Sequence, residues 1–300
     1  MANLQISALG KKQILRKTVP AFLRKLTMWT ALRWVIAILW VVIAVFPLWW
    51  VFCVTFSPTG VPVTQQWYPS SLTDGLQKIQ TVIHDSKNPT IPQAAWVSFM
   101  YIIIQTAGIV IVCSMAAYEF ALFDFTGKNF LFTLALSSLM FPVAVTLIPL
   151  FRVVVSLHWL NTFMGLAIPG MSSALALFIF RQFMESLPRE LMDAARVDGA
   201  THFGVYWRII MPLSWNATLT VIVLNAVGIW GNYLWPLVSM TKPEMQTISI
   251  VAAGVAGTQA WKTADYAITV YFLSAIPPVL IYIFLQRYIT QGFTMSGLKG

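Results

Sequence analysis

The residues best able to do chemistry gather in one stretch, from Pro188 to Pro212, which holds three arginines and three acids. Carboxylates and guanidinium groups at helical spacing suit ion pairing and docking, whereas catalysis needs a nucleophile and a base at one depth. The sequence has no HExxH and no GxSxG motif. Its nearest approach to a nucleotide-binding loop, GFTMSGLK at 292–299, has no Ser or Thr after the lysine. We therefore expect no enzyme, no ATP site and no bound cofactor.

The cysteines and histidines show no metal-ligand spacing. Cys53 and Cys113 fall inside apolar runs, where a thiol packs as a small apolar group, so we expect no disulfide. No Cys, Asp or Glu completes a ligand pattern around His84, His158 or His202. These histidines are expected to be loop residues, without a metal.

Composition places the chain in lipid. Hydrophobic residues make up 58% and charged residues only 10%, whereas soluble domains are about 25% charged. The net charge of +9 does not indicate nucleic acid, because seven of the nineteen basic residues precede the first apolar run. That is where the cytoplasmic anchor of a membrane protein lies.

Six uncharged runs are long enough to cross a bilayer core of about 30 Å, which takes about 20 helical residues. We expect an all-α bundle of six transmembrane helices. They are Trp34 to Val54, Ala94 to Tyr118, Phe130 to Phe151, Thr162 to Phe180, Leu213 to Val238 and Ala267 to Gln286. The first run is 21 residues long and ends without a small-x-small cleavage pattern, so we expect an uncleaved span.

The distribution of basic residues orients the bundle. With the N-terminus inside, 14 of the 19 Lys and Arg lie on the cytoplasmic side and 5 outside. This asymmetry predicts that both termini are cytoplasmic. In the first outer loop, Leu72 to Ile83 is amphipathic and predicts a short surface helix.

Polar side chains inside the expected spans are uncharged. A membrane carrier coupled to protons or ions usually needs a charged residue there, so energy must come from elsewhere. Asn225, Gly228 and Asn232 fall at i, i+3 and i+7, on one helical face. That face can line a path for a polar, uncharged solute, or it can serve helix–helix hydrogen bonding with close approach at Gly228. Further polar positions are Gln105, Ser137, Ser138, Thr146, Ser172 and Ser173.

The charged stretch reads as two capped helices. Pro188 suits a first helical turn, and Glu190 lies where the helix dipole favours an acid. The first helix should end near Asp198, with Gly199 as the residue after its C-cap. Thr201 can then cap a second helix, from His202 to Met211.

The first of these helices is amphipathic in an unusual way. Leu191, Ala194 and Ala195 share one face and form a narrow ridge, with Arg189, Asp193 and Arg196 opposite. Such a ridge can enter a groove on another protein. It can equally pack beneath the chain's own bundle, and the residues alone leave both readings open.

The run from Asp193 to Pro212 resembles the EAA motif of the permease subunits of ATP-binding cassette importers. The pattern is E-A-A-x3-G-x9-I-x-L-P; Ala194, Ala195, Gly199, Ile209 and Pro212 match it, while Asp193 replaces Glu and Met211 replaces Leu. The segment 161–169 and the ending 286–300 are also similar to the carbohydrate-uptake branch, which contains the maltose and glycerol-phosphate permeases.

This resemblance implies roles for particular residues. The first helix becomes a coupling helix that sits in a cleft of an ATPase subunit, with Gly199 making the bend. The expected coupling residues are Glu190, Asp193, Ala194, Ala195, Asp198, Gly199, Ile209 and Pro212. A second contact with the ATPase is implied for the C-terminal tail at Gly292, Gly297 and Lys299. The outer loop around Trp261 resembles the loop that faces a solute-binding protein, and Asn225, Gly228 and Asn232 are pathway candidates.

The resemblance also implies an assembly and a place. The partners would be a second, different permease chain, two ATPase subunits that hold ATP and Mg, a solute-binding protein and the lipid bilayer, without nucleic acid. We expect a basic tail at 1–33, the first span and outer loop at 34–93, a transmembrane domain at 94–287 with the charged loop at 181–212, and a cytoplasmic tail at 288–300. The location would be a bacterial inner membrane. The solute would be a sugar, polyol glycoside or glycerol phosphate; the alternatives are an importer for peptides or polyamines, or a secondary transporter.

Overall fold

The computed structural model describes residues 28–85, 89–258 and 264–294, which form helices and no strand. The α-helices are α2 Met28–Thr55, α3 Leu72–His84, α4 Ile91–Leu122, α5 Lys128–Ser137, α6 Val143–Ser156, α7 Phe163–Ala167, α8 Ala174–Met184, α9 Glu190–Val197, α10 His202–Val205, α11 Met211–Leu213, α12 Trp215–Trp230, α13 Leu234–Ser239, α14 Ile248–Thr258 and α15 Ala264–Thr294. Shorter turns are η2 Val63–Gln65, η3 Ser138–Met140, η4 Ile168–Gly170, η5 Tyr206–Ile210 and η6 Pro243–Met245. The surface helix expected in the first outer loop is α3.

The described helices provide six membrane crossings when each bent pair of helices is taken as one span. Three long helices, α2, α4 and α15, are apolar enough to span alone. Three further crossings are bent pairs: α5–η3 with α6 at 104°, α7–η4 with α8 at 49°, and α10–α11 with α12 at 74°. The expected six-helix bundle is confirmed, but three of its spans are broken.

Local backbone chemistry explains the breaks. Phe141 is extended (φ −81°, ψ 123°) because the following Pro142 disfavours helical geometry in the residue before it. Ser173 is also extended, and its hydroxyl caps α8 by accepting the N–H of Ala176. Length and hydropathy alone predicted continuous runs here, and they do not register such breaks.

The fifth span is shorter than predicted. It was expected to run from Leu213 to Val238, but α12 ends at Trp230 and α13 begins after a turn at Gly231 and Asn232. The sixth is longer, because α15 continues to Thr294.

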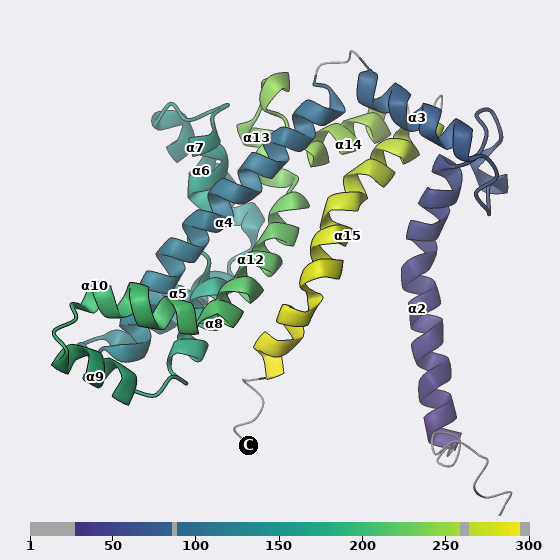
Figure 1. Ribbon diagram of the computed structural model, residues 1–300. Coiled ribbons are helices and arrows are strands. Elements are labelled where there is room, and N and C mark those ends of the chain that lie inside the picture. The colour runs from purple at the N-terminus through teal and green to yellow at the C-terminus, as the bar shows by residue number, and fades with distance from the viewer. Residues whose placement is uncertain (1–27, 86–88, 259–263, 295–300) are drawn as a thin grey trace, which may run out of the picture.

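The core centres on α4, which packs against α8, α12 and α14. Small buried side chains such as Ala94, Ala117 and Ala176 allow these helices to approach closely. Helix α2 stands apart from this core, packing chiefly against α15 and α3 (Figure 1). No residue in its most apolar stretch is buried within the chain.

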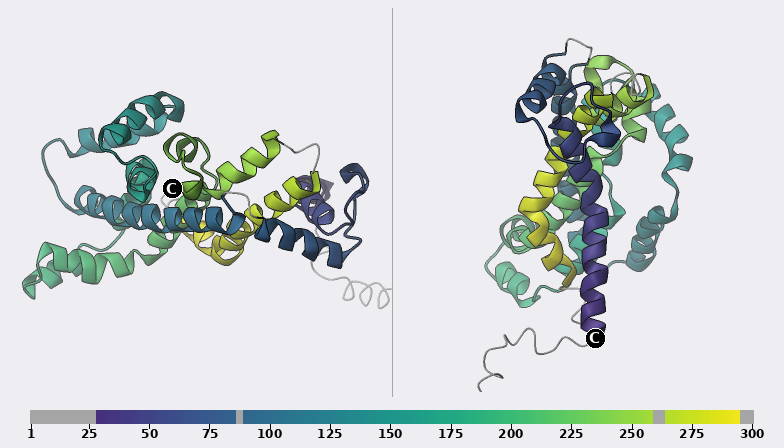
Figure 2. Two further views of the ribbon diagram at one scale, coloured as in Figure 1. Left: turned by 90° about the horizontal axis from the view of Figure 1, so that it is seen from above. Right: turned by 90° about the vertical axis from the view of Figure 1, so that its right-hand side faces the viewer.

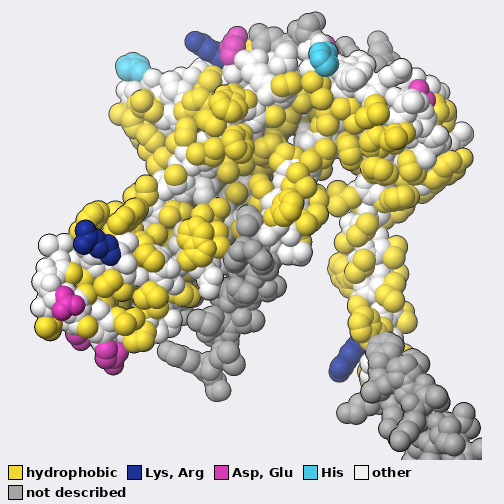
Figure 3. Space-filling view, viewed as in Figure 1, with side chains coloured by type: hydrophobic (Ala, Val, Ile, Leu, Met, Phe, Trp, Pro, Cys, Tyr) yellow, Lys and Arg dark blue, Asp and Glu magenta, His cyan; other side chains and the backbone are white. Residues whose placement is uncertain are grey.

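The molecule has two distinct ends. The start of α2 and the end of α15 lie at the same end as α9 and α10, whereas α3, α7, α13 and α14 lie at the other (Figures 1 and 2). Charged side chains gather at the ends, and hydrophobic side chains cover the surface between them (Figure 3). Below, the end with α9 is called the inner end and the other the outer end, following the expected orientation.

Candidate functional site

Helix α9 forms the tip of the inner end. After the C-cap Asp198, Gly199 adopts φ +81°, the left-handed conformation that glycine takes without strain. The N–H of Ala200 donates to the Ala195 carbonyl at 2.9 Å, and that of Gly199 donates to the Arg196 carbonyl at 3.0 Å. This pair of bonds is the Schellman motif. The predicted helix, its end and its glycine bend are therefore present.

The two faces of α9 differ from the prediction. Met192 and Ala195 are buried against the chain's own bundle, while Leu191, Ala194 and Val197 are exposed, Val197 at 88%. The expected ridge of Leu191, Ala194 and Ala195 is thus divided between the two faces. Met192 and Ala195, three residues apart, both pack against the bundle, and this packing sets the rotation of the helix. Both readings of the helix hold in part: one face packs on the chain, and the other is free.

The acids of α9 lie on its free surface. Glu190 and Asp193 occupy the first turn, where the positive end of the helix dipole favours them, and Asp198 lies at the C-cap. All three are exposed, and none forms an ion pair with any residue in the described ranges. Their carboxylates are available to a cationic group on another protein.

A second arm, formed by residues 201–212 (α10, η5 and the start of α11), leads from α9 back to the bundle. Thr201 caps it as predicted, its hydroxyl accepting the N–H of Gly204 at 3.1 Å. The arm is not one α-helix: after α10 the chain makes a π-helical turn, in which the N–H of Met211 donates to the Tyr206 carbonyl five residues back. Ile209 is half-buried and Pro212 exposed on this arm. π-Helical turns of this kind occur often at functional sites.

The arm is tied to the inner half of α4 by two hydrogen bonds. The hydroxyls of Ser114 and Tyr206 lie 2.7 Å apart in a buried contact. The Tyr118 hydroxyl donates to the His202 carbonyl at 3.2 Å, and the ring centroids of Tyr118 and Tyr206 lie 5.4 Å apart. A displacement of the arm must therefore move α4 or break these bonds.

A guanidinium group joins the arm to α9 itself. Nη2 of Arg196 lies 3.2 Å from Nδ1 of His202, and its guanidinium carbon is 5.8 Å from the Phe123 ring centroid. Because a guanidinium only donates, Nδ1 accepts in this contact. His202 thus links α10 to α9 through its contact with Arg196. In the described part of the chain, no group of His, Cys, Asp or Glu side chains has the geometry of a metal site.

The three pathway candidates do not share one helical face. The amide of Asn225 donates to the Val221 carbonyl of its own helix at 2.8 Å. Asn232 lies beyond the end of α12, where its amide donates to the Tyr101 hydroxyl at 3.2 Å and its carbonyl accepts from Ser249. Gly228 is exposed and has open space beside it. The predicted polar face is wrong because Gly231 ends the helix.

A contact that the sequence did not reveal joins spans two and four. The buried amide of Gln105 donates to the Gly170 carbonyl at 3.1 Å, and a Cβ at Gly170 would lie 2.3 Å from that amide nitrogen. Gln105 was visible as a polar residue in an apolar run. Its partner, 65 residues away, became predictable only once η4 was known to expose a carbonyl.

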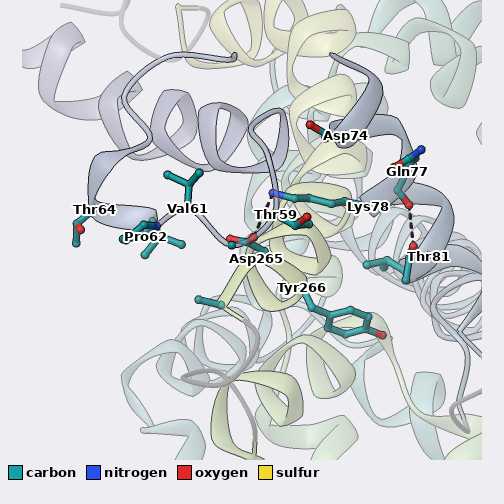
Figure 4. A pocket seen from close by; sticks show the side chains of 14 residues that line it. Thr59, Val61, Pro62, Thr64, Asp74, Gln77, Lys78, Thr81, Asp265 and Tyr266 are labelled. Carbon is teal, nitrogen blue, oxygen red and sulfur yellow. Dashed lines mark hydrogen bonds and ion pairs between the residues drawn. The ribbon is translucent and has the colours of Figure 1, made fainter. Parts of the chain in front are cut away.

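The outer end carries a cavity of about 730 Å³ between the turn at Thr59 to Thr64, α3 and the start of α15 (Figure 4). Lys78 lies on its wall and is only 7% exposed. Its ammonium donates to the Val54 carbonyl at 3.0 Å and lies 3.4 Å from the Asp265 carboxylate. This buried ion pair fixes α3 to the end of α2 and the beginning of α15.

Four predicted residues cannot be placed in full. Trp261, Gly297 and Lys299 lie outside the described residues, and Gly292 falls in the last turn of α15, where only the backbone is described.

The sequence of the chain is similar to a known protein family and to several transport permeases. Residues 109–295 match the family described as the binding-protein-dependent transport system inner membrane component. The arabinooligosaccharides transport system permease protein AraQ of Halalkalibacterium halodurans is 34% identical over 207 residues, covering 69% of this chain and 72% of that protein. The sn-glycerol-3-phosphate transport system permease protein UgpE of Brucella melitensis is 31% identical over 268 residues, covering 86% and 93%.

A solved structure shares the fold. It is the crystal structure of a bacterial ABC transporter involved in the import of the acidic polysaccharide alginate, matched with a TM-score of 0.75 over 87% of this chain and 96% of that one. The sequences are 20% identical, so this likeness concerns the fold alone.

Proposed function

Because the chain belongs to the family of binding-protein-dependent transport system inner membrane components, we propose that it is the permease subunit through which an ATP-driven importer takes up a carbohydrate-like solute. The observation that carries the proposal is the exposed face of α9, with its three unpaired carboxylates at the inner end. An exposed, capped helix with free acids is suited to docking on an ATPase subunit that supplies the energy, with ATP and Mg bound there.

The contacts of the second arm could transmit a movement of α9 to the membrane helices. Closure of an ATPase dimer around α9 would pull the arm, and the Ser114–Tyr206 and Tyr118–His202 bonds would carry that movement into α4. Because α4 packs against α8 and α12, its tilt would change which end of the pathway is open. A second, different permease chain would complete the pathway, and a solute-binding protein would deliver solute at the outer end.

Two features support a hydroxylated solute that carries no positive charge. The described membrane helices hold no charged side chain in mid-span, and their polar groups are hydroxyls and amides. Relatives that are 31–37% identical are named for transport of arabinooligosaccharides and of sn-glycerol-3-phosphate. A polyamine would be better served by carboxylates along the path, and a secondary transporter by an ionisable residue at mid-depth.

The test is solute uptake by the reconstituted importer. The chain is co-expressed with the second permease and the ATPase of its importer, and the complex is placed in liposomes with its binding protein. Uptake of labelled arabinotriose, sn-glycerol 3-phosphate and putrescine is compared with and without enclosed ATP. We expect ATP-dependent uptake of the sugar or the glycerol phosphate. Uptake of putrescine alone, or uptake driven by a proton gradient without ATP, would overturn the proposal.

A further inference from the structure

A second cavity, of about 210 Å³, is half open and lies between α4, the α5–η3 bend and the start of α8, with Ser138 and Ser172 exposed. None of its lining residues is charged, and four carry a hydroxyl or a thiol: Cys113, Ser138, Ser172 and Ser173. At the liquid volume of water it has room for about seven water molecules. The cavity is therefore small and uncharged, and its hydroxyl and thiol groups lie among apolar neighbours.

Two of the three broken spans have their breaks beside this cavity. Span four is interrupted at 171–173, and span three is bent at 141–142, after the turn η3 that begins at Ser138. Within a membrane, non-helical backbone is tolerated where it is buried in protein or lines a hydrated space, because its polar groups need partners. Broken helices at mid-depth are also how membrane carriers build solute sites.

The lengths of the helices place the cavity near the middle of the bilayer. Ala174 begins the 11 residues of α8, which cover about 16 Å to the inner end at 1.5 Å per residue. Cys113 lies nine residues before the end of α4, which is about 14 Å. Both values are close to half of a bilayer core of about 30 Å.

The serines retain unused hydrogen-bonding capacity. The Ser138 hydroxyl donates to the Ala135 carbonyl, so its oxygen can still accept. Ser173 accepts from the N–H of Ala176, so its O–H remains to donate. Ser172 is exposed and has no hydrogen-bond partner in the described ranges. Together they offer donors and acceptors, which is what a hydroxyl group of a sugar requires.

We propose that this cavity contacts the solute during transport, with Ser138, Ser172 and Ser173 binding hydroxyl groups of a single neutral sugar or polyol unit. The inference rests on the proposed import function, and it restricts the class of imported solute to uncharged sugars and polyols. No lining residue is cationic, so the cavity favours an uncharged ring over a phosphate ester. Cys113, only 4% exposed, lies against the break through contacts with Ser173 and reports on access to the site.

Thiol labelling tests the cavity directly. Cys53→Ala leaves Cys113 as the one thiol of this chain, and the complete importer is treated in liposomes with a small, charged methanethiosulfonate. We expect Cys113 to react, and saturating arabinotriose to slow the reaction at least threefold, whereas sn-glycerol 3-phosphate at equal concentration does not. Reaction only with apolar N-ethylmaleimide would identify a lipid crevice and overturn the proposal. Uptake of arabinotriose without protection of Cys113 would also overturn it while leaving the import function intact.

Serine variants provide a matched second test. Ser137 and Ser138 each donate to a backbone carbonyl at 2.7 Å, to Leu134 and Ala135 respectively, but only Ser138 lines the cavity. We expect Ser138→Ala and Ser172→Ala to raise the KM of sugar uptake by about tenfold, because one hydrogen bond to the solute is lost. Ser172→Thr, which keeps the hydroxyl, and Ser137→Ala should leave the KM within about twofold. Equal effects of Ser137→Ala and Ser138→Ala would mean that the changes act on the helix and not on the solute.

Discussion

Substitution of Gly199 by valine isolates the contribution of the loop that follows α9. Gly199 has φ +81°, and a Cβ added there would meet nothing within 4 Å. The cost is therefore backbone strain without a clash, about 1–2 kcal/mol for a left-handed residue with a side chain and more for a β-branched one. A strain of this size lowers the ratio of native to non-native loop by a factor of about 5–30.

The assay measures ATP hydrolysis and solute uptake together in the reconstituted importer. We expect Gly199→Val to keep basal hydrolysis and to lose solute-stimulated hydrolysis and uptake by a factor of up to about 30. Gly199→Asn should retain most of the activity, because asparagine tolerates the left-handed conformation. The graded series separates backbone strain from a simple effect of size.

Gly127 supplies the matched control. It has φ +85°, it also has no atom within 4 Å of an added Cβ, and it lies at the inner end before α5. Gly127→Val therefore carries the same strain without touching α9, and it should leave the ratio of transport to hydrolysis unchanged. Normal uptake by Gly199→Val, or an equal loss in both variants, would refute the reasoning.

Two further predictions concern stability, measured as unfolding of the detergent-solubilised chain. Lys78→Met should cost about 3 kcal/mol, because it leaves the Asp265 carboxylate and a carbonyl without their buried partner, whereas Lys128→Met, at an exposed pair, should cost less than about 1 kcal/mol; similar losses would contradict the role of burial. Gly170→Ala should cost about 1–3 kcal/mol by displacing the Gln105 amide, and Gln105→Ala in the same chain should recover part of that loss. Strict additivity of the two changes would show that the contact carries no energy.

The membrane crossings could be predicted from the sequence because each depends on a run of neighbouring residues. Hydrophobic length and the absence of charge located all six. The breaks depend on finer local chemistry, such as the effect of Pro142 on Phe141, which a window of average hydropathy does not register. Proline was visible in the sequence, but whether it bends a span or is absorbed, as Pro47 is in α2, depends on packing.

The tip of the inner end was predictable for a different reason. Gly199 and Thr201 act on their own neighbourhood through a left-handed turn and a cap, so residue type fixes the local structure. The rotation of α9 was not predictable, because Ala194 and Ala195 are alike in the sequence and only packing decides which is buried.

The polar contacts between helices of the bundle could not be predicted from the sequence. Asn232 reaches Tyr101 across 131 residues, and Tyr206 reaches Ser114 across 92. Each side chain was recognisable as polar or aromatic, but the pairing follows from helix packing. The cavity lined by Ser138 and Ser172 likewise depends on how spans three and four pack beside α4.

Crosslinking at Ala194 tests the central claim most directly, that the free face of α9 docks on an ATPase subunit. Ala194 is exposed on that face and has a small side chain, so Ala194→Cys, made with Cys53→Ala and Cys113→Ala, changes little else. Treatment of the complete importer with a short reagent that links a thiol to an amine should join this chain to the ATPase. The introduced thiol should stay unreactive to an impermeant reagent added outside intact cells. Labelling from outside, or crosslinks to other partners but none to the ATPase, would contradict the account.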